Sequence, residues 1–218
     1  MSNVSNTLET LEFEVWRIQG HPAVDDLSCE EMNILQAIRN PKARLTFVQS
    51  RTAIRKIVKN YAIQPPVEYA IQTHASGKPF LVNNPHLHFS LSHSQGELAI
   101  AFSRFPVGFD MENQSRRGDF HALARRFFSP DEFADVEGER QAANLRFLEL
   151  WTAKEAMLKL EGTGISGGLK RAILVDAAEG RLDGRRVFLH RLEWRGFLAK
   201  IASYEKPAAV RVRDLIFD

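Results

Sequence analysis

The chain is poor in cysteine, in long apolar runs and in net charge, and each shortage excludes a class of protein. Cys29 is the single cysteine among 218 residues, so neither an intrachain disulfide nor a cysteine-rich zinc site can form. No apolar stretch approaches the roughly 20 residues that a membrane-spanning helix needs. Lysine and arginine total 29 and aspartate and glutamate 27, and a net charge of +2 is too small to predict nucleic-acid binding.

The beginning of the chain lacks the pattern of a secretion signal. Residues 1–10 are polar, with no positively charged start followed by an apolar run. Together with the single cysteine, this predicts a cytoplasmic protein without membrane association. Since 44% of the residues are hydrophobic, the chain can form one large domain or two small halves, each with its own core.

The hydrophobic pattern predicts two successive groups of a strand, helices and further strands. The first group comprises a strand at 12–18, helices after Ser28 and Pro41, a strand at 67–72 and a hairpin from 87 to 102. The second group comprises a strand at 107–112, a long helix at 139–160 and strands within 172–217. Runs of hairpin-ready strands favour an α+β fold with antiparallel sheets. We therefore expect two similar halves, residues 1–105 and 106–218, each an antiparallel sheet with packed helices.

Two capping boxes mark helix starts. In each, a serine precedes a glutamate by three positions, and each side chain bonds the backbone N–H of the other residue. Ser28 and Glu31 predict a helix that begins near residue 29. Ser129 and Glu132, with Pro130 at the favoured first position, predict another that begins near residue 130.

Two acidic residues lie two positions apart in the strand at 107–112. Asp110 and Glu112 face the same way as Gly108, because side chains alternate between the faces of a strand. Two carboxylates on one face repel each other unless a cation lies between them, and oxygen ligands without Cys or His suit Mg²⁺ rather than Zn²⁺. The alternative is a solvated strand edge. Gly108 indicates close approach of a ligand or another backbone, or else a bulge.

The long helix carries a stripe of three residues spaced four apart. Trp151, Glu155 and Lys159 share one helical face. A Glu–Lys pair at this spacing usually forms an exposed bridge, but the apolar neighbours here predict partial burial. In the hairpin, Ser90 and Ser92 share a face near His93, and these groups could receive phosphate. The alternative for His93 is plain surface.

Five short segments follow one another in an order that is specific as a set. They are GKP at 77–79, FSLSHS at 89–94, VGFDME at 107–112, FFSPDE at 127–132 and WTAKEAMLK at 151–159. Together they resemble the Sfp-type 4′-phosphopantetheinyl transferases over about Gly77 to Gly164. The N-terminal stretch matches loosely, and the C-terminal strands carry no diagnostic motif.

The resemblance implies a fold and an activity. The fold would be two similar α+β halves packed as a pseudo-dimer with coenzyme A between them, and a monomer is favoured. The activity would be Mg²⁺-dependent transfer of 4′-phosphopantetheine from coenzyme A to a serine of an apo acyl- or peptidyl-carrier protein, with release of adenosine 3′,5′-bisphosphate. The alternative is a catalytically silent coenzyme A- or nucleotide-binding module of the same fold.

The resemblance also implies roles for the residues of the second half. Asp110, Glu112 and Glu155 would hold Mg²⁺, with Mn²⁺ as an alternative. Glu155 would also act as general base, directly or through water, for the incoming serine. Lys159 would contact phosphate and assist the leaving group, and Lys154 is a further co-substrate contact.

The remaining implied roles concern coenzyme A and the carrier. The GKP turn (Gly77, Lys78, Pro79) would approach the adenine through backbone atoms. Ser92 and His93 would bind coenzyme A, with His93 at the 3′-phosphate. The family's phosphate-binding arginine falls at Thr46 here, which leaves Arg44 or Arg51 as substitutes, and Lys42 after them. The expected docking site for an acidic carrier, or in the alternative a solvated face, consists of Arg116, Arg117, Arg125 and Arg126.

Overall fold

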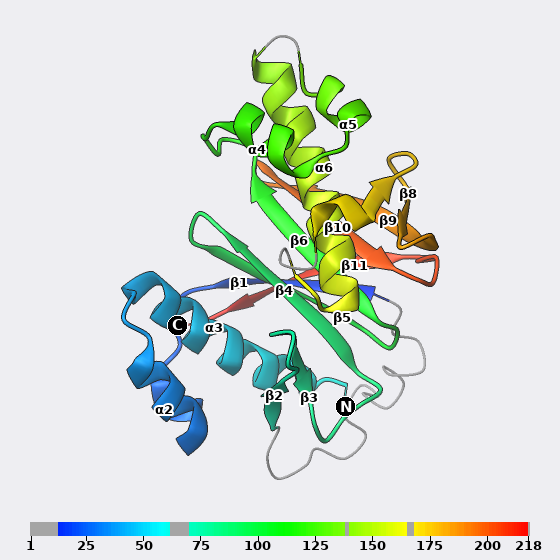
Figure 1. Ribbon diagram of the computed structural model, residues 1–218. Coiled ribbons are helices and arrows are strands. Elements are labelled where there is room, and N and C mark those ends of the chain that lie inside the picture. The colour runs from blue at the N-terminus through cyan, green and yellow to red at the C-terminus, as the bar shows by residue number, and fades with distance from the viewer. Residues whose placement is uncertain (1–12, 62–69, 138–139, 165–167, 218) are drawn as a thin grey trace.

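The computed structural model describes residues 13–61, 70–137, 140–164 and 168–217, arranged as two sheets with helices packed on them and a small two-stranded ribbon (Figure 1). Half of the predicted strand at 67–72 therefore lies outside the described residues, as do the first residues of the strand at 12–18 and of the helix at 139–160. None of the helices in the described ranges is both long and apolar enough to cross a membrane.

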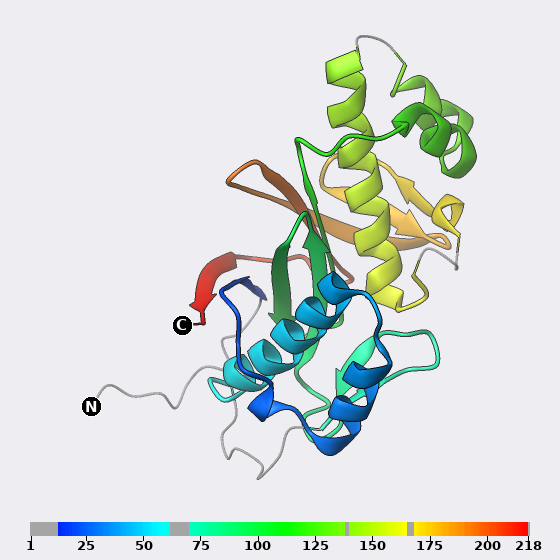
Figure 2. The ribbon, with the colours of Figure 1, turned by 90° about the vertical axis from the view of Figure 1, so that its left-hand side faces the viewer.

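The first sheet has the strand order β11-β1-β5-β4. Its strands are β1 (Phe13–Gln19), β4 (His88–Ser94), β5 (Glu97–Ser103) and β11 (Val210–Ile216). The short elements beside it are η1 (Val24–Asp26), α2 (Cys29–Ala37), β2 (Ile71–Thr73) and β3 (Pro79–Leu81). Helix α3 (Pro41–Val58) lies across this sheet (Figure 2), and its buried Ile54 and Ile57 pack with Phe89 and Phe102.

The second sheet is antiparallel throughout, with the order β6-β10-β9-β8-β7. Its strands are β6 (Val107–Asn113), β7 (Ala172–Leu174), β8 (Glu179–Leu182), β9 (Arg185–Trp194) and β10 (Phe197–Ser203). The helical elements of this half are α4 (Phe120–Phe127), α5 (Pro130–Ala134), α6 (Arg140–Glu161) and η3 (Leu169–Arg171). Helix α6 runs along this sheet (Figure 2), and its Phe147, Leu150 and Met157 belong to one continuous apolar core with Leu189.

Both predicted capping boxes form. Ser28 accepts a hydrogen bond from the Glu31 amide while the Glu31 carboxylate accepts one from the Ser28 amide, and the same exchange joins Ser129 and Glu132. The predicted long helix is α6. Each of these signals is local in the sequence, which is why they predict the elements well.

The C-terminal strand departs from the expected division into two antiparallel halves. Strand β11 falls in the predicted second half, 106–218, yet it pairs with β1 in the sheet of the first half. The pairing is parallel, whereas β1 and β5 are antiparallel. The boundary at residue 105 thus does not describe this strand, and the first sheet is mixed.

A third apolar cluster joins the two sheets. It combines Val15 and Ala101 of the first sheet with Phe109, Met111 and Ile201 of the second, all of them buried. Because this cluster draws on both sheets, the two halves share a core along their seam. Strands β4 and β6 lie beside each other at that seam.

Candidate active site

Strand β6 carries Asp110 into the buried seam between the halves. The Asp110 side chain is 5% exposed, and its Oδ1 accepts hydrogen bonds from Ser92 Oγ and Lys159 Nζ, both at 2.7 Å. The other oxygen, Oδ2, is buried and has no hydrogen-bond partner. An unpartnered buried carboxylate oxygen is costly, so Asp110 fits a role in which a cation is bound at Oδ2.

Glu155 of helix α6 lies near the two acids of β6. The pKa of its carboxyl is raised to about 7: burial is the largest cause, the Asp110 and Glu112 carboxylates act in the same direction, and Lys159 and Arg116 oppose them. Burial also raises the pKa of Glu112, against the effects of Ser94 and Arg116. The structure therefore brings together the strand acids and the helix acid, as the sequence predicts.

The reason for this proximity is the glycine in β6. A Cβ at Gly108 would lie 1.9 Å from the carbonyl oxygen of Ala156 and 2.4 Å from the amide nitrogen of Leu160. The backbone of α6 therefore rests directly on β6. Of the two interpretations of Gly108, close approach of another backbone is the correct one, and it brings the face of α6 that bears Glu155 onto the seam.

The three acids offer the oxygen donors that a hard divalent cation prefers, although their carboxylates do not surround a common position. Within the described ranges, no set of three or more His, Cys, Asp or Glu residues lies ready to hold a metal ion. Instead Lys159 pairs with Asp110 and Arg116 pairs with Glu112. A divalent ion would take the open Oδ2 of Asp110 and replace Arg116 at Glu112, and the oxygen-only donors suit Mg²⁺.

Lys159 is not the exposed partner of Glu155 that its spacing would suggest. Besides Asp110, its ammonium donates to Ser92 Oγ at 3.1 Å and to the Leu91 carbonyl at 3.4 Å. It thus links α6 of the second half with β4 of the first. The prediction of partial burial for this stripe is confirmed, since Trp151 is buried and Glu155 and Lys159 are partly buried.

A hollow of about 280 Å³ opens beside Lys159, the lysine that pairs with Asp110. It is lined by Ser76, Gly77, Lys78, Pro79, Ser90, Leu91, Lys159, Gly162 and Gly164. The predicted GKP turn and Lys159 are therefore brought together from opposite halves. The sequence interpretation missed Gly162 and Gly164 as lining residues, and the signal for them was the glycine-rich end of the long helix.

The GKP turn is held in place by its lysine. Lys78 Nζ donates to the carbonyls of Val107 and Leu160, each at 3.0 Å, and burial lowers the pKa of its ammonium to about 8. Gly77 has a φ of 94°, a conformation that favours glycine. The side chain of Lys78 thus fastens the turn to β6 and α6, which leaves the backbone of the turn to line the hollow.

Ser92 and His93 lie on opposite faces of β4. Ser92 is 4% exposed and bonds Asp110, so its hydroxyl is turned towards the acids. His93 is exposed and is not among the described residues that line the hollow. Its predicted contact with the 3′-phosphate stays a prediction.

Lys154 lies elsewhere. Its ammonium is buried, pairs with Glu132 Oε1 at 2.8 Å, and donates to the carbonyls of Leu169 (3.1 Å) and Ala172. Burial lowers the pKa of this lysine, and Glu132 opposes that effect. These contacts tie α6 to α5 and to the start of β7, and they give no support to the prediction that Lys154 binds the co-substrate.

The two arginine candidates of α3 also serve the scaffold. Arg44 donates to the carbonyls of Leu35 and Ile38 at the end of α2, and the Arg51 Nε lies 3.6 Å from Glu31 Oε1. Burial lowers the pKa of Arg51. Neither residue lines the hollow in the part of the chain that the structure describes, so their role as phosphate ligands is unsupported.

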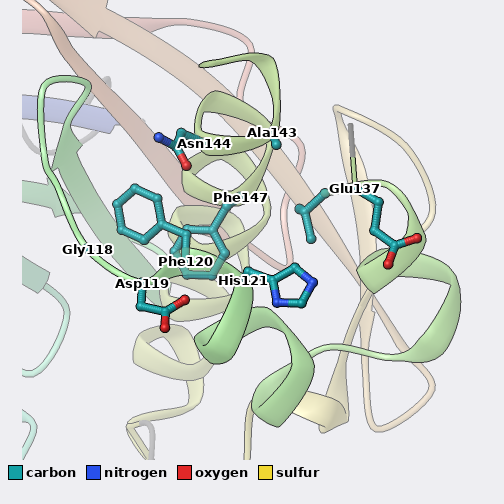
Figure 3. Close-up of a pocket in the computed structure, with 9 residues that line it drawn as sticks. Gly118, Asp119, Phe120, His121, Glu137, Ala143, Asn144 and Phe147 are labelled. Carbon is teal, nitrogen blue, oxygen red and sulfur yellow. The ribbon is translucent and has the colours of Figure 1, made fainter. Parts of the chain in front are cut away.

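The four arginines expected at a docking face have different surroundings. Arg116 pairs with Glu112, Arg117 donates to the Ser115 carbonyl at 3.0 Å, and Arg125 and Arg126 are exposed in the last turn of α4. A second hollow, of about 740 Å³, adjoins the start of α4 (Figure 3). It is lined by Gly118, Asp119, Phe120, His121, Val136, Glu137, Ala143, Asn144 and Phe147. None of the three acids lines either hollow, but only the smaller one is lined by Lys159, which contacts Asp110.

Comparison with known proteins gives the family. The family model described as the 4′-phosphopantetheinyl transferase superfamily matches residues 106–207, which include Asp110, Glu112 and Glu155. The 4′-phosphopantetheinyl transferase HetI of Nostoc sp. PCC 7120 is 32% identical over 174 residues, which cover 73% of each chain. The 4′-phosphopantetheinyl transferase psf-1 of Bacillus pumilus is 41% identical over 119 residues, 53% of this chain and 49% of that one.

A third relative, the 4′-phosphopantetheinyl transferase Sfp of Bacillus subtilis strain 168, is 30% identical over 114 residues, 52% of this chain and 50% of that one. The chain thus spans from about half to three quarters of the length of these curated relatives. Two findings decide the family: the match to HetI covers 73% of each chain, and the family model covers the half that carries the acids. The chain belongs to the Sfp-type family of the 4′-phosphopantetheinyl transferase superfamily.

Proposed function

We propose that the protein transfers 4′-phosphopantetheine from coenzyme A to a serine of an apo acyl- or peptidyl-carrier protein and releases adenosine 3′,5′-bisphosphate. The observation that carries this proposal is that Asp110, Glu112 and Glu155 lie near one another, and that Lys159, the partner of Asp110, lines a hollow together with the GKP turn. Psf-1, HetI and Sfp are all named 4′-phosphopantetheinyl transferases, which supports the same reaction.

The reaction exchanges one phosphorus–oxygen bond for another. The carrier serine oxygen bonds to the phosphorus that bears the pantetheine. The bond from that phosphorus to the bridging pyrophosphate oxygen breaks, and its electron pair leaves with adenosine 3′,5′-bisphosphate. Asp110, Glu112 and Glu155 would hold Mg²⁺, which when bound neutralises charge on the pyrophosphate.

The chain's own residues supply proton transfer and charge. Glu155, directly or through a water molecule, takes the proton of the serine hydroxyl, and a carboxyl whose pKa is raised by burial is a stronger base than a solvated one. Lys159 lines the hollow and reaches Asp110 at 2.7 Å, which supports a role at the pyrophosphate and the leaving group. Coenzyme A would lie along the GKP turn, across the seam between the two halves of one chain. A monomer would therefore contain a complete site. The expected compartment is the cytoplasm.

The carrier would dock on the exposed arginines of the second half. Arg117, Arg125 and Arg126 are exposed, and their positive charge would steer an acidic partner. Arg116 belongs to the same segment, but its contact with Glu112 ties it to the acids.

The test is direct. The protein is incubated with Mg²⁺, coenzyme A and a panel of apo carrier proteins, and mass spectrometry reads the added arm. Glu155→Gln should abolish the addition without loss of folding. The matched control is Glu149→Gln, on the same helix but paired with Arg146 and Arg191, and it should transfer normally. If the folded protein binds coenzyme A yet modifies no carrier, it is a silent binding module.

A further inference from the structure

Strands β4 and β6 lie in different sheets, yet serine hydroxyls of β4 form hydrogen bonds to β6 at regular intervals along the two strands. Three serines at alternate positions of β4 each accept a hydrogen bond from a backbone amide of β6. The bonds run from Phe109 to Ser90 at 3.0 Å, from Met111 to Ser92 at 3.3 Å and from Asn113 to Ser94 at 3.3 Å. We call these three residues the serine ladder. Its constant offset of 19 residues means that the two strands run in the same direction along the seam.

Two rungs of the serine ladder also hold the metal-binding acids. Ser92 Oγ donates to Asp110 Oδ1 at 2.7 Å, and Ser94 Oγ donates to Glu112 Oε2 at 2.8 Å. A hydroxyl has one proton to donate and lone pairs with which to accept, so each of these serines satisfies an amide and a carboxylate at once. Among the described residues, the Ser90 hydroxyl has no carboxylate partner.

The two oxygens of Glu112 have partners of different kinds. Oε1 contacts Arg116, a cation that a divalent ion would replace, whereas Oε2 is held by the neutral hydroxyl of Ser94. The Ser94 hydroxyl can therefore keep its bond to Oε2 of Glu112 while Arg116 at Oε1 is replaced by a divalent ion. Asp110 differs in that Ser92 and Lys159 both contact its Oδ1, while its Oδ2 is buried without a partner.

We propose that Ser94 is a positioning residue of the acid cluster, which fixes the Glu112 carboxylate so that its Oε1 faces a bound divalent ion. The inference rests on the proposed function only in taking Glu112 as a metal ligand. Ser94 is 7% exposed, so an alanine there would leave Glu112 Oε2 and the Asn113 amide without their partner in a buried place. The alternative is that the ladder only fastens the two halves together.

The experiment compares two rungs of the same strand. Ser94→Ala removes a seam bond and a carboxylate bond, and the matched control Ser90→Ala removes a seam bond alone. Mn²⁺ is titrated into each full-length protein and free Mn²⁺ is read by electron paramagnetic resonance. Ser94→Ala should weaken Mn²⁺ binding by about tenfold, as loss of a partner to a metal ligand commonly does. Ser90→Ala should bind Mn²⁺ like the wild type, and Ser94→Thr, which keeps the hydroxyl, should restore binding.

Amide hydrogen exchange measured by NMR supplies an independent readout. The Asn113 amide should exchange faster in Ser94→Ala, and the Phe109 amide in Ser90→Ala. If Ser94→Ala does not fold, Ser94→Cys replaces it, because a thiol is a weak donor and should also weaken Mn²⁺ binding.

The outcomes separate this inference from the proposed function. Unchanged Mn²⁺ affinity in Ser94→Ala with faster exchange at Asn113 would show a ladder that only fastens the halves, and would overturn the inference. A wild-type protein that binds no Mn²⁺ would overturn it too. If the wild type binds Mn²⁺ but modifies no carrier, the proposed transfer fails while the Mn²⁺ affinities of the variants still decide the role of Ser94.

Discussion

Replacing Gly108 by alanine tests the close contact between β6 and α6 with a single methyl group. The added Cβ would lie 1.9 Å from the Ala156 carbonyl oxygen and 2.4 Å from the Leu160 amide nitrogen, both of them backbone atoms of the helix. Contacts of a Cβ below 3.0 Å are essentially never seen, so the helix and the strand must separate by about 1 Å. Neither partner can yield by rotating a side chain.

The expected change in stability has the opposite sign to the general rule. In a strand interior, alanine is more favourable than glycine by roughly 0.5–1 kcal/mol. At Gly108 the overpacking should instead cost about 1–3 kcal/mol of unfolding free energy. The separation also moves Glu155 away from Asp110, and a displacement of about 1 Å can lower a catalytic rate by on the order of a hundredfold.

Urea unfolding and the rate of carrier modification measure the two effects. Gly118→Ala is the control, since the three atoms nearest to its added Cβ are all ring carbons of the Phe120 side chain, the first at 3.2 Å. A Gly108→Ala protein as stable as the wild type or more so would refute the claim that the helix backbone rests on this strand.

Three further predictions concern buried charges. Lys154→Met should destabilise the fold by about 3 kcal/mol, because it leaves the Glu132 carboxylate without its buried partner. The KM for coenzyme A should stay unchanged in Lys154→Met, and a large rise in that KM would indicate that Lys154 does bind coenzyme A. Lys78 has a folded pKa of about 8, below its unfolded value of 10.5, so the unfolded chain binds more protons between these values and this lysine makes stability rise from pH 8 to 10.5. Urea unfolding over that range should show a steeper rise for the wild type than for Lys78→Met, and equal slopes would contradict the lowered pKa. Glu155→Gln should melt within a few degrees of the wild type by calorimetry, since the buried carboxyl is replaced by a neutral group, and a collapse of the fold would mean that Glu155 is structural.

The sequence predicted the site where the signals were local. The spacing of Asp110 and Glu112 set them on one face of a strand, and the glycine at 108 indicated the close approach that brings Glu155 to them. The serine–glutamate capping boxes predicted helix starts correctly, because each needs contacts within only three residues.

The predictions that the structure does not support concern residues whose partners are distant in the chain. Lys154 and Lys159 lie on the same helix and both are basic, yet one pairs with Glu132 and the other with Asp110. Spacing on one helix cannot show which side chain meets which neighbour. The same limit applies to Arg44, whose guanidinium is engaged by carbonyls at the end of α2.

The place of β11 was likewise beyond local patterns, since strand pairing over about 200 residues is set by the packed core rather than by the letters of the strand. A hairpin predicts its own partner through its turn. A parallel pair such as β1 and β11 has no turn to reveal it.

The parallel pairing of β1 with β11 also sets an order of events during synthesis. Strand β1 emerges early from the ribosome, but its outer edge is not covered until residues 210–216 have been translated. Until then, one row of backbone amides and carbonyls of β1 lacks the partner it has in the folded protein, and such an open edge invites pairing with other nascent chains. Strand β11 thus shields a strand that is synthesised long before it.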